Sequence, residues 1–351
     1  MQRGKRRRGF QAVAVVALCL LAAMASPVSV TSPTLQGNPG GKDTGDMLHP
    51  QEPDASPPTN GSRRCHPGTS LRFLVHDGRL RSYYLHLPPP GIQSQPLPLV
   101  IALHAGGSNA VDMMRTTNLS GLADRAGFAV VYPNGITRLN PWWRMWNGGY
   151  CCGVAYEKNV DDVGFIRSLV EEMSQQVAID PQRIYVTGHS NGAIMAYRLA
   201  SQLSHLVAAV APVAGAIGGT ASEDSPPYVI PPPRHPVSVI AFHGLLDENV
   251  PYHGGHGNHT WGTGTDLSVN DSISFWVQHN GCRPVPTTTV SESGNIVVDT
   301  YSGGINGTEV VLYTIVNGGH GWPGSSRGDR PTQEISATQL MWNFFTKHPR
   351  P

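Results

Sequence analysis

Short apolar runs alternate with amphipathic segments along most of the chain. The runs are rich in β-branched residues and predict buried strands at 98–103, 128–132, 183–187, 207–211, 237–242 and 309–316. Apolar residues at helical spacing predict helices at about 110–126, 161–177, 191–203, 268–279 and 333–347. This alternation is typical of an α/β protein whose mostly parallel sheet carries helices on both faces.

The segment 161–177 has the clearest helical pattern. Asp161 is a suitable N-cap, and the apolar residues that follow fall on one helical face: Val163, Ile166, Leu169, Val170, Met173 and Val177. Earlier in the chain, alternating runs at 71–75 and 81–87 flank Asp77-Gly78. This arrangement predicts an antiparallel hairpin at the start of the sheet.

The first 64 residues differ from the rest of the chain. A basic cluster precedes the apolar run 12–25, which ends in Ala23-Met24-Ala25, so residues 1–25 are predicted to be a cleaved export signal. An uncleaved anchor is the alternative, but fourteen apolar residues are short for a membrane span. Residues 26–64 contain 21 Pro, Gly, Ser or Thr and no aromatic residue, which indicates a linker before a folded domain at 65–351. The mature protein is expected to be secreted, without stable membrane insertion.

Composition narrows the class of protein. The 351 residues include 40 Gly and 30 Pro but only 14% charged residues, which argues against a coiled coil or a helical repeat. Five of the 25 basic residues lie in the first eight positions, so signal removal leaves 20 basic against 24 acidic residues, a net charge of about −4. No basic face is apparent, and no nucleic-acid partner is predicted.

Four cysteines follow the signal: Cys65, Cys151, Cys152 and Cys282. An even number in an exported protein predicts two disulfides, although free buried thiols are an alternative. A bond between the neighbours Cys151 and Cys152 would close a strained ring, so each is expected to pair separately, with Cys65 and Cys282 in either order. The absence of a Cys-x-x-Cys pair argues against zinc.

Residues 188–192 read Gly-His-Ser-Asn-Gly between a predicted strand and a predicted helix. This context is that of a nucleophile elbow, which presents Ser190 at the end of the sheet. One oxyanion donor would be the N–H of Asn191. The other would come from Gly106, or from Ala105, in the His-Ala-Gly-Gly run at 104–107 that ends an earlier strand.

Two later strands end in residues that complete a catalytic triad. Asp247 follows the strand 237–242, and His320 follows the strand 309–316. The order Ser, Asp, His along the chain is that of α/β-hydrolases. Asp161 and Asp162 are alternative acids, but helix capping explains them better.

Two other features of the sequence are candidate binding sites. His253, His256 and His259 are spaced three apart, but no carboxylate lies among them, so no metal is predicted. The irregular stretch 133–160 carries several aromatic residues beside the paired cysteines, and such long loops often line functional sites. Trp146 in this stretch and Trp322 beside His320 are the candidate substrate-binding residues; burial in the core is the alternative for each.

These motifs together resemble the secreted polyhydroxybutyrate depolymerase-like esterases, which overlap the feruloyl and acetyl-xylan esterases of carbohydrate esterase family 1. The resemblance spans about residues 68–349 and is carried by the motifs at 147–152, 161–166, 188–192, 243–252 and 319–324. It implies an α/β-hydrolase fold and the triad Ser190, Asp247 and His320. The run at 104–107 departs from the usual His-Gly-Gly-Gly type.

The sequence therefore predicts a secreted serine carboxylesterase that needs no metal or organic cofactor. Its expected partner is an ester-bearing small molecule or polymer, foremost a feruloyl or acetyl ester of plant polysaccharide. A hydroxyalkanoate polyester or oligomer is the second candidate. A non-catalytic binding protein on the same fold is the alternative from another class, for which Arg327-Gly328-Asp329 would be an adhesion motif.

Overall fold

The computed structural model describes residues 67–91, 96–138, 143–258 and 263–351, all within one compact unit, Asn60–Pro351. The predicted signal, the linker and Cys65 lie outside these residues. Among the described residues, ten strands form the main sheet. In spatial order they are β1 (Gly68–His76), β2 (Arg79–Leu87), β4 (Ala129–Pro133), β3 (Leu97–Leu103), β5 (Ile179–His189), β6 (Ala209–Val213), β9 (Ser238–Gly244), β13 (Val310–Ile315), β12 (Ile296–Tyr301) and β11 (Thr287–Val290).

The centre of this sheet is parallel and its two edges are antiparallel. The strands from β4 to β13 run parallel, and the hairpin β1–β2 joins β4 antiparallel, as the sequence predicted. The opposite edge, formed by β12 and β11, was not predicted. All four residues of β11, Thr-Thr-Thr-Val, are exposed, so this strand lacks the apolar alternation that marks a half-buried strand.

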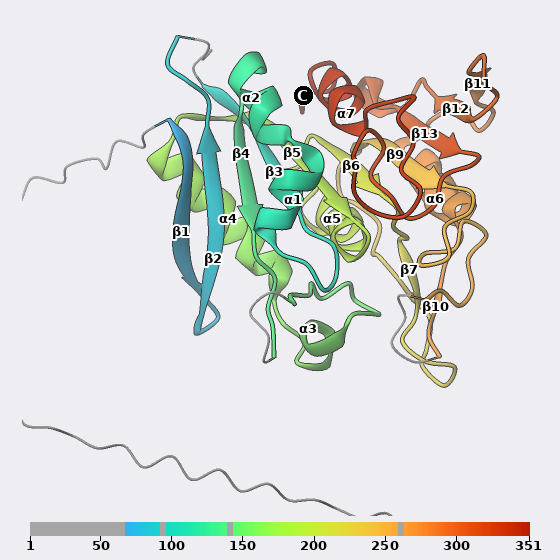
Figure 1. The fold of residues 1–351 in the computed structure, drawn as a ribbon, viewed down its shortest axis with the longest axis horizontal. Helices are drawn as coiled ribbons and strands as arrows, with labels where there is room; N and C mark the ends of the chain where they lie inside the picture. The colour runs from blue at the N-terminus through green and yellow to red at the C-terminus, as the bar shows by residue number, and fades with distance from the viewer. Residues whose placement is uncertain (1–66, 92–95, 139–142, 259–262) are drawn as a thin grey trace, which may run out of the picture. The chain divides into compact units, whose positions relative to one another are not determined.

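Helices cover both faces of the sheet (Figure 1). One core cluster joins a sheet face to α4 (Asp162–Gln176), α5 (Asn191–Gln202) and α6 (Val269–Asn280). The other joins the opposite face to α1 (Ala110–Thr117), α2 (Leu119–Ala126) and α7 (Ala337–Phe345). Strand β3 shows the division, because Leu99 and Ile101 belong to the first cluster and Val100 to the second.

Local signals set the helix boundaries. Asp161 caps α4 as expected, since its Oδ1 accepts from the N–H of Gly164 at 2.8 Å. The predicted helix at 110–126 is two helices, because Asn118 lies in the left-handed region with φ 49° and ends α1. The short helix α3 (Gly153–Glu157) and a small sheet of β10 (Thr265–Asp266), β7 (Gly218–Thr220) and β8 (Tyr228–Val229) were not predicted.

The α/β fold class predicted from the sequence is confirmed. The carboxyl ends of the parallel strands carry the loops in which the candidate site residues lie, as is usual for α/β sheets. Within the described residues, no helix combines the length and the apolar character that a membrane span requires.

Asp162 at the start of α4 is expected to be a major source of stability. Its side chain is fully buried and accepts from the Arg81 guanidinium at 2.7 Å and from the N–H of Asn147 at 2.8 Å. The carboxylate thus compensates the positive charge of the buried Arg81. Asp162→Ala should lower the free energy of unfolding by roughly 3–5 kcal/mol, because it leaves Arg81 buried without a counter-charge. Urea denaturation at neutral pH measures this change.

The matched control is Glu157→Ala, which removes one partner of the exposed Arg138–Glu157 ion pair. Exposed pairs contribute about 0–1 kcal/mol, so this variant should unfold close to the wild-type midpoint. Equal losses in the two variants would contradict the role given to Asp162.

Candidate active site

Ser190 lies at a sharp turn between β5 and α5. Its φ of 56° is unusual for a residue other than glycine, and strained backbone of this kind occurs at functional sites. A side chain at Gly188 would meet the carbonyl oxygen of Gly192 at 2.2 Å, and one at Gly192 would meet that of Leu103 at 2.4 Å. Both glycines are therefore required by close backbone approach, as the elbow motif predicted.

Asp247 and His320 lie together, as the sequence predicted. The Nδ1–H of His320 donates to Oδ2 of Asp247 at 2.7 Å. The other carboxylate oxygen accepts from the N–H groups of Asn249 and Val250 at 2.8 and 2.9 Å. Burial alone would raise the pKa of Asp247, but hydrogen bonds from His243 and His320 outweigh it and hold the pKa below its ordinary value. The carboxylate is thus ionised beside the imidazole.

Two further histidines contact this pair. His189 donates from Nε2 to the backbone carbonyl of His320 at 2.9 Å, which ties the turn that carries Ser190 to the His320 loop. Burial is the main cause that lowers the pKa of His189 to about 3. His243 donates to the carbonyl of Val250 at 2.8 Å and lies 3.4 Å from Asp247 Oδ2.

A cavity of about 370 Å³ joins the predicted residues. It is lined by Ala105, Gly106, Gly107, Trp143, Met145, Cys152, Ser190, Asn191, Asn249 and His320. Ser190, His320 and both predicted oxyanion residues therefore share one space. Trp143, with 53% of its surface exposed, is the aromatic residue of the 133–160 stretch that lines it.

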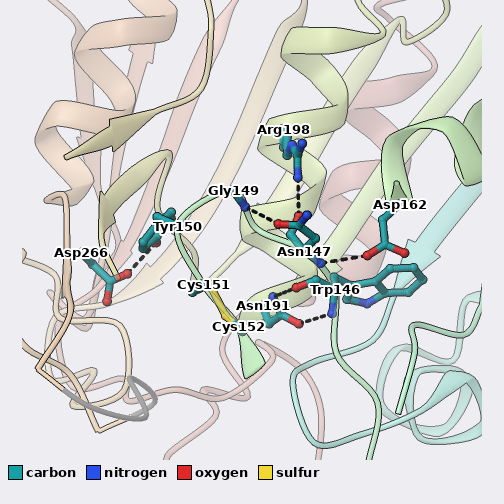
Figure 2. The surroundings of a disulfide bond; sticks show 10 residues. All are labelled: Trp146, Asn147, Gly149, Tyr150, Cys151, Cys152, Asp162, Asn191, Arg198 and Asp266. Carbon is teal, nitrogen blue, oxygen red and sulfur yellow. Dashed lines mark hydrogen bonds between the residues drawn. A yellow bond between two sulfur atoms is a disulfide. The ribbon is translucent and has the colours of Figure 1, made fainter. Parts of the chain in front are cut away.

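The side chain of Asn191 is engaged away from the cavity. Its Oδ1 accepts from the N–H of Trp146 at 2.8 Å, and its Nδ2 donates to the Trp146 carbonyl at 3.0 Å (Figure 2). The backbone N–H of Asn191 begins α5, where no carbonyl of the same helix can accept it. This group is the donor available to a ligand.

The peptide between Ala105 and Gly106 is also held. His104 donates from Nδ1 to the Ala105 carbonyl at 2.8 Å, and its Nε2 accepts from the N–H of Gly135 at 3.0 Å. Burial lowers the pKa of His104 to about 3, which keeps the ring neutral in this arrangement. Because the carbonyl and N–H of one peptide point in opposite directions, fixing the Ala105 oxygen also fixes the direction of the Gly106 N–H.

The prediction that Trp146 and Trp322 contact substrate is wrong. Trp146 has no exposed surface, and its indole N–H donates to the His104 carbonyl at 3.0 Å. Trp322 is 1% exposed and donates to Thr338 Oγ1 at 3.1 Å from within the second core cluster. Trp146 was predicted from its aromatic stretch and Trp322 from its place beside His320, and neither signal reveals that the ring turns into the core.

The predicted cysteine pairing is corrected as well. Cys151 and Cys152 are joined to each other, with their Cα atoms 3.2 Å apart across a cis peptide. Cys282 is a buried free thiol at the end of α6, where its Sγ donates to the carbonyl of Thr308 at 3.6 Å. This thiol is packed against the turn at 304–308 and does not meet the paired cysteines.

The remaining histidine cluster forms no metal site in the described residues. Nδ1 of His256 donates to the carbonyl of Gly264 at 2.9 Å, and His259 lies outside the described residues. In the part of the chain that the structure describes, no three His, Cys, Asp or Glu side chains are grouped as metal ligands would be.

Comparison with known proteins agrees with the fold and the motifs. Residues 81–226 match the family described as esterase PHB depolymerase. NocK of Nocardia uniformis subsp. tsuyamanensis, named an esterase, is 29% identical over 75% of this chain and 76% of its own length. Feruloyl esterase B of Piromyces equi is 28% identical over 64% of this chain, a match that spans only 39% of that protein. The acetyl xylan esterase structure from Aspergillus awamori superimposes with a TM-score of 0.51 at 15% identity, covering 72% of this chain and 94% of its own.

The buried neutral state of His189 predicts a pH dependence of stability. Its pKa falls from the ordinary 6.5 to about 3 on folding, so the unfolded chain binds more protons between these values. Stability should therefore decrease as the pH falls from 6.5 towards 3. His189→Gln keeps an N–H donor for the His320 carbonyl but cannot be protonated, so its unfolding free energy should fall less steeply with decreasing pH.

Urea denaturation at several pH values between 4 and 7 measures the two slopes. His235→Gln, which replaces an exposed histidine, is the control and should keep the wild-type slope. An unchanged slope in His189→Gln would show that this ring is not the source of the acid sensitivity.

Proposed function

We propose that this chain, an esterase of the α/β-hydrolase fold, cleaves carboxylic esters through an acyl-enzyme formed on Ser190. The observation that carries the proposal is the placement of Ser190 and His320 in one cavity while His320 donates to the buried Asp247 at 2.7 Å. A binding protein that had lost its activity would not need this arrangement, in which the buried Asp247 carboxylate accepts a hydrogen bond from His320 and Ser190 has a positive φ.

The hydrogen bond to Asp247 assigns the protons of the base. Nδ1 of His320 keeps its proton and donates a hydrogen bond to Asp247, so Nε2 is the ring nitrogen that can take the proton of Ser190. Ser190 Oγ then attacks the ester carbonyl, and Asp247 stabilises the imidazolium that forms. The imidazolium returns the proton to the leaving alcohol, and water releases the acyl group by the same steps.

The oxyanion is stabilised by two backbone donors in this mechanism. The N–H of Asn191 and the N–H of Gly106 are the proposed pair, with Ala105 as the alternative source of the second donor. Their support is that both peptides are already held: the Ser190 carbonyl accepts from the N–H groups of Ala193 and Ile194, and the Ala105 carbonyl accepts from His104. Donors fixed before substrate binds need no reorganisation when charge develops.

The proposed substrates are feruloyl or acetyl esters of plant polysaccharide. The names of the feruloyl and acetyl xylan esterases matched above favour this class, and Trp143 offers an exposed ring at the cavity. Hydroxyalkanoate polyesters or oligomers are the second candidate, favoured by the family description that residues 81–226 match. The predicted signal at 1–25 supports secretion as the setting for either polymer.

Ser190→Ala should lower kcat for a p-nitrophenyl ester by roughly 10³-fold or more, because the triad acts as a unit. Circular dichroism and thermal unfolding establish that the variant is folded. A folded variant that kept a tenth of the wild-type activity would exclude Ser190 as the nucleophile.

Labelling with a fluorophosphonate provides an independent measurement. The wild-type protein should carry one adduct on the peptide that contains Ser190, and Ser190→Ala should carry none. Wild-type protein that stays unlabelled would favour the non-catalytic alternative.

A further inference from the structure

The cavity that holds Ser190 has a wall containing sulfur. Cys152 and Met145 line it together with Trp143, and both sulfur-bearing residues are 9% exposed. They belong to a small apolar cluster with Ala155, against which Ile136 and Cys151 pack. One side of the cavity is thus catalytic and polar, while this wall presents a disulfide, a thioether and an indole.

The loop that carries the disulfide is held by other interactions. Arg198 donates to the carbonyl of Asn147 at 2.7 Å, and Asp162 accepts from the N–H of the same residue. Beyond it, the Tyr150 hydroxyl donates to Asp266 Oδ1 at 2.6 Å. Figure 2 shows these contacts beside the disulfide. They hold the loop at Asn147 and Tyr150, just before the paired cysteines, without using either sulfur.

A disulfide between adjacent residues contributes little to global stability. Cross-links stabilise chiefly by shortening the loops of the unfolded chain, and the effect grows with the number of residues enclosed. The Cys151–Cys152 bond has a sequence separation of one and encloses no loop. Its consequence in the folded protein is therefore local, at the surface it presents to the cavity.

The sulfur wall begins beside the proposed oxyanion donors. A Cβ placed on Gly106 would lie 3.1 Å from Met145 Sδ and 3.3 Å from Asn191 Cβ. Met145 therefore lies beside the residues that would hold an ester carbonyl, within reach of a group attached to that carbonyl. Polarisable sulfur makes favourable contacts with aromatic rings, and an acetyl methyl offers no such surface.

We propose that the Cys151–Cys152 disulfide is a specificity determinant that selects flat, conjugated acyl groups, such as hydroxycinnamoyl, over acetyl. This assignment rests on the proposed esterase function and narrows its substrate class. The disulfide acts together with Met145, which forms the part of the wall nearest the oxyanion donors.

Ethyl ferulate and ethyl acetate test the assignment, because they share the leaving alcohol and differ only in the acyl group. In Cys151→Ser/Cys152→Ser, kcat/KM for ethyl ferulate should fall about tenfold, the loss of one or two sulfur–ring contacts. The value for ethyl acetate should change less than about twofold. Met145→Ala should shift the ratio of the two values in the same direction.

A dithiol reductant tests the wild-type protein without substitution. It breaks the S–S bond, two protein thiols form, and the dithiol is oxidised to its cyclic disulfide. Reduced wild-type protein, verified by alkylation and mass spectrometry, should approach the ratio of the double variant, whereas the double variant should not respond. This arm remains decisive if the double variant does not fold.

Cys282→Ser is the matched control, since it alters a buried cysteine outside the cavity, and should keep the wild-type ratio. Equal losses on both esters, or an unchanged ratio, would overturn the proposal, as would wild-type protein that prefers ethyl acetate. Wild-type protein inactive on both esters would instead contradict the proposed function.

Discussion

A reciprocal pair of hydrogen bonds between the Asn191 side chain and the Trp146 backbone joins the two halves of the cavity. Asn191 follows the nucleophile and begins α5, while Trp146 lies in the loop after β4. The oxygen and the nitrogen of the Asn191 side-chain amide both have hydrogen-bond partners within the protein, so this side chain can be buried. The backbone N–H of Asn191 is also a proposed oxyanion donor. The Asn191 side chain therefore ties this donor to the loop whose residues Trp143 and Met145 line the cavity.

A buried charged network extends this constraint to the first hairpin. Arg81 of β2 pairs with Asp162 at the start of α4, and its guanidinium lies 3.9 Å from the centre of the Phe165 ring. Asp162 also accepts from Asn147, directly after Trp146. Segments far apart in the sequence thus meet at one loop, which is held at two consecutive residues, Trp146 and Asn147. A buried ion pair of this kind is costly to break, which favours a single arrangement of the site.

The sequence predicted the parts of the molecule that local chemistry determines. Buried parallel strands are short runs of β-branched residues, and the elbow around Ser190 depends on glycines that its neighbours require. Whether a side chain faces the core or the cavity is decided by tertiary packing. Trp146 and Trp143 are near neighbours in the same irregular stretch, yet one is fully buried and the other half exposed. The predicted disulfide pairing was wrong for the same reason. It was based on the strain expected between neighbouring cysteines, whereas tertiary packing places Cys282 away from Cys151 and Cys152.

His320 lines the cavity, and three further histidines lie behind its lining residues, where their surroundings give them different roles. His104 and His189 are buried and neutral, and each donates to a backbone carbonyl that orients a neighbouring peptide or loop. His243 donates beside the carboxylate of Asp247. His320 lines the cavity. Its Nδ1 donates to the ionised carboxylate of Asp247, and Nε2 is the nitrogen proposed to accept a proton. A general base needs a charged form that its site stabilises, and the hydrogen bond to Asp247 at 2.7 Å suits His320 to the role proposed for it. His104, His189 and His243 instead donate to backbone carbonyls, and burial lowers the pKa of the first two.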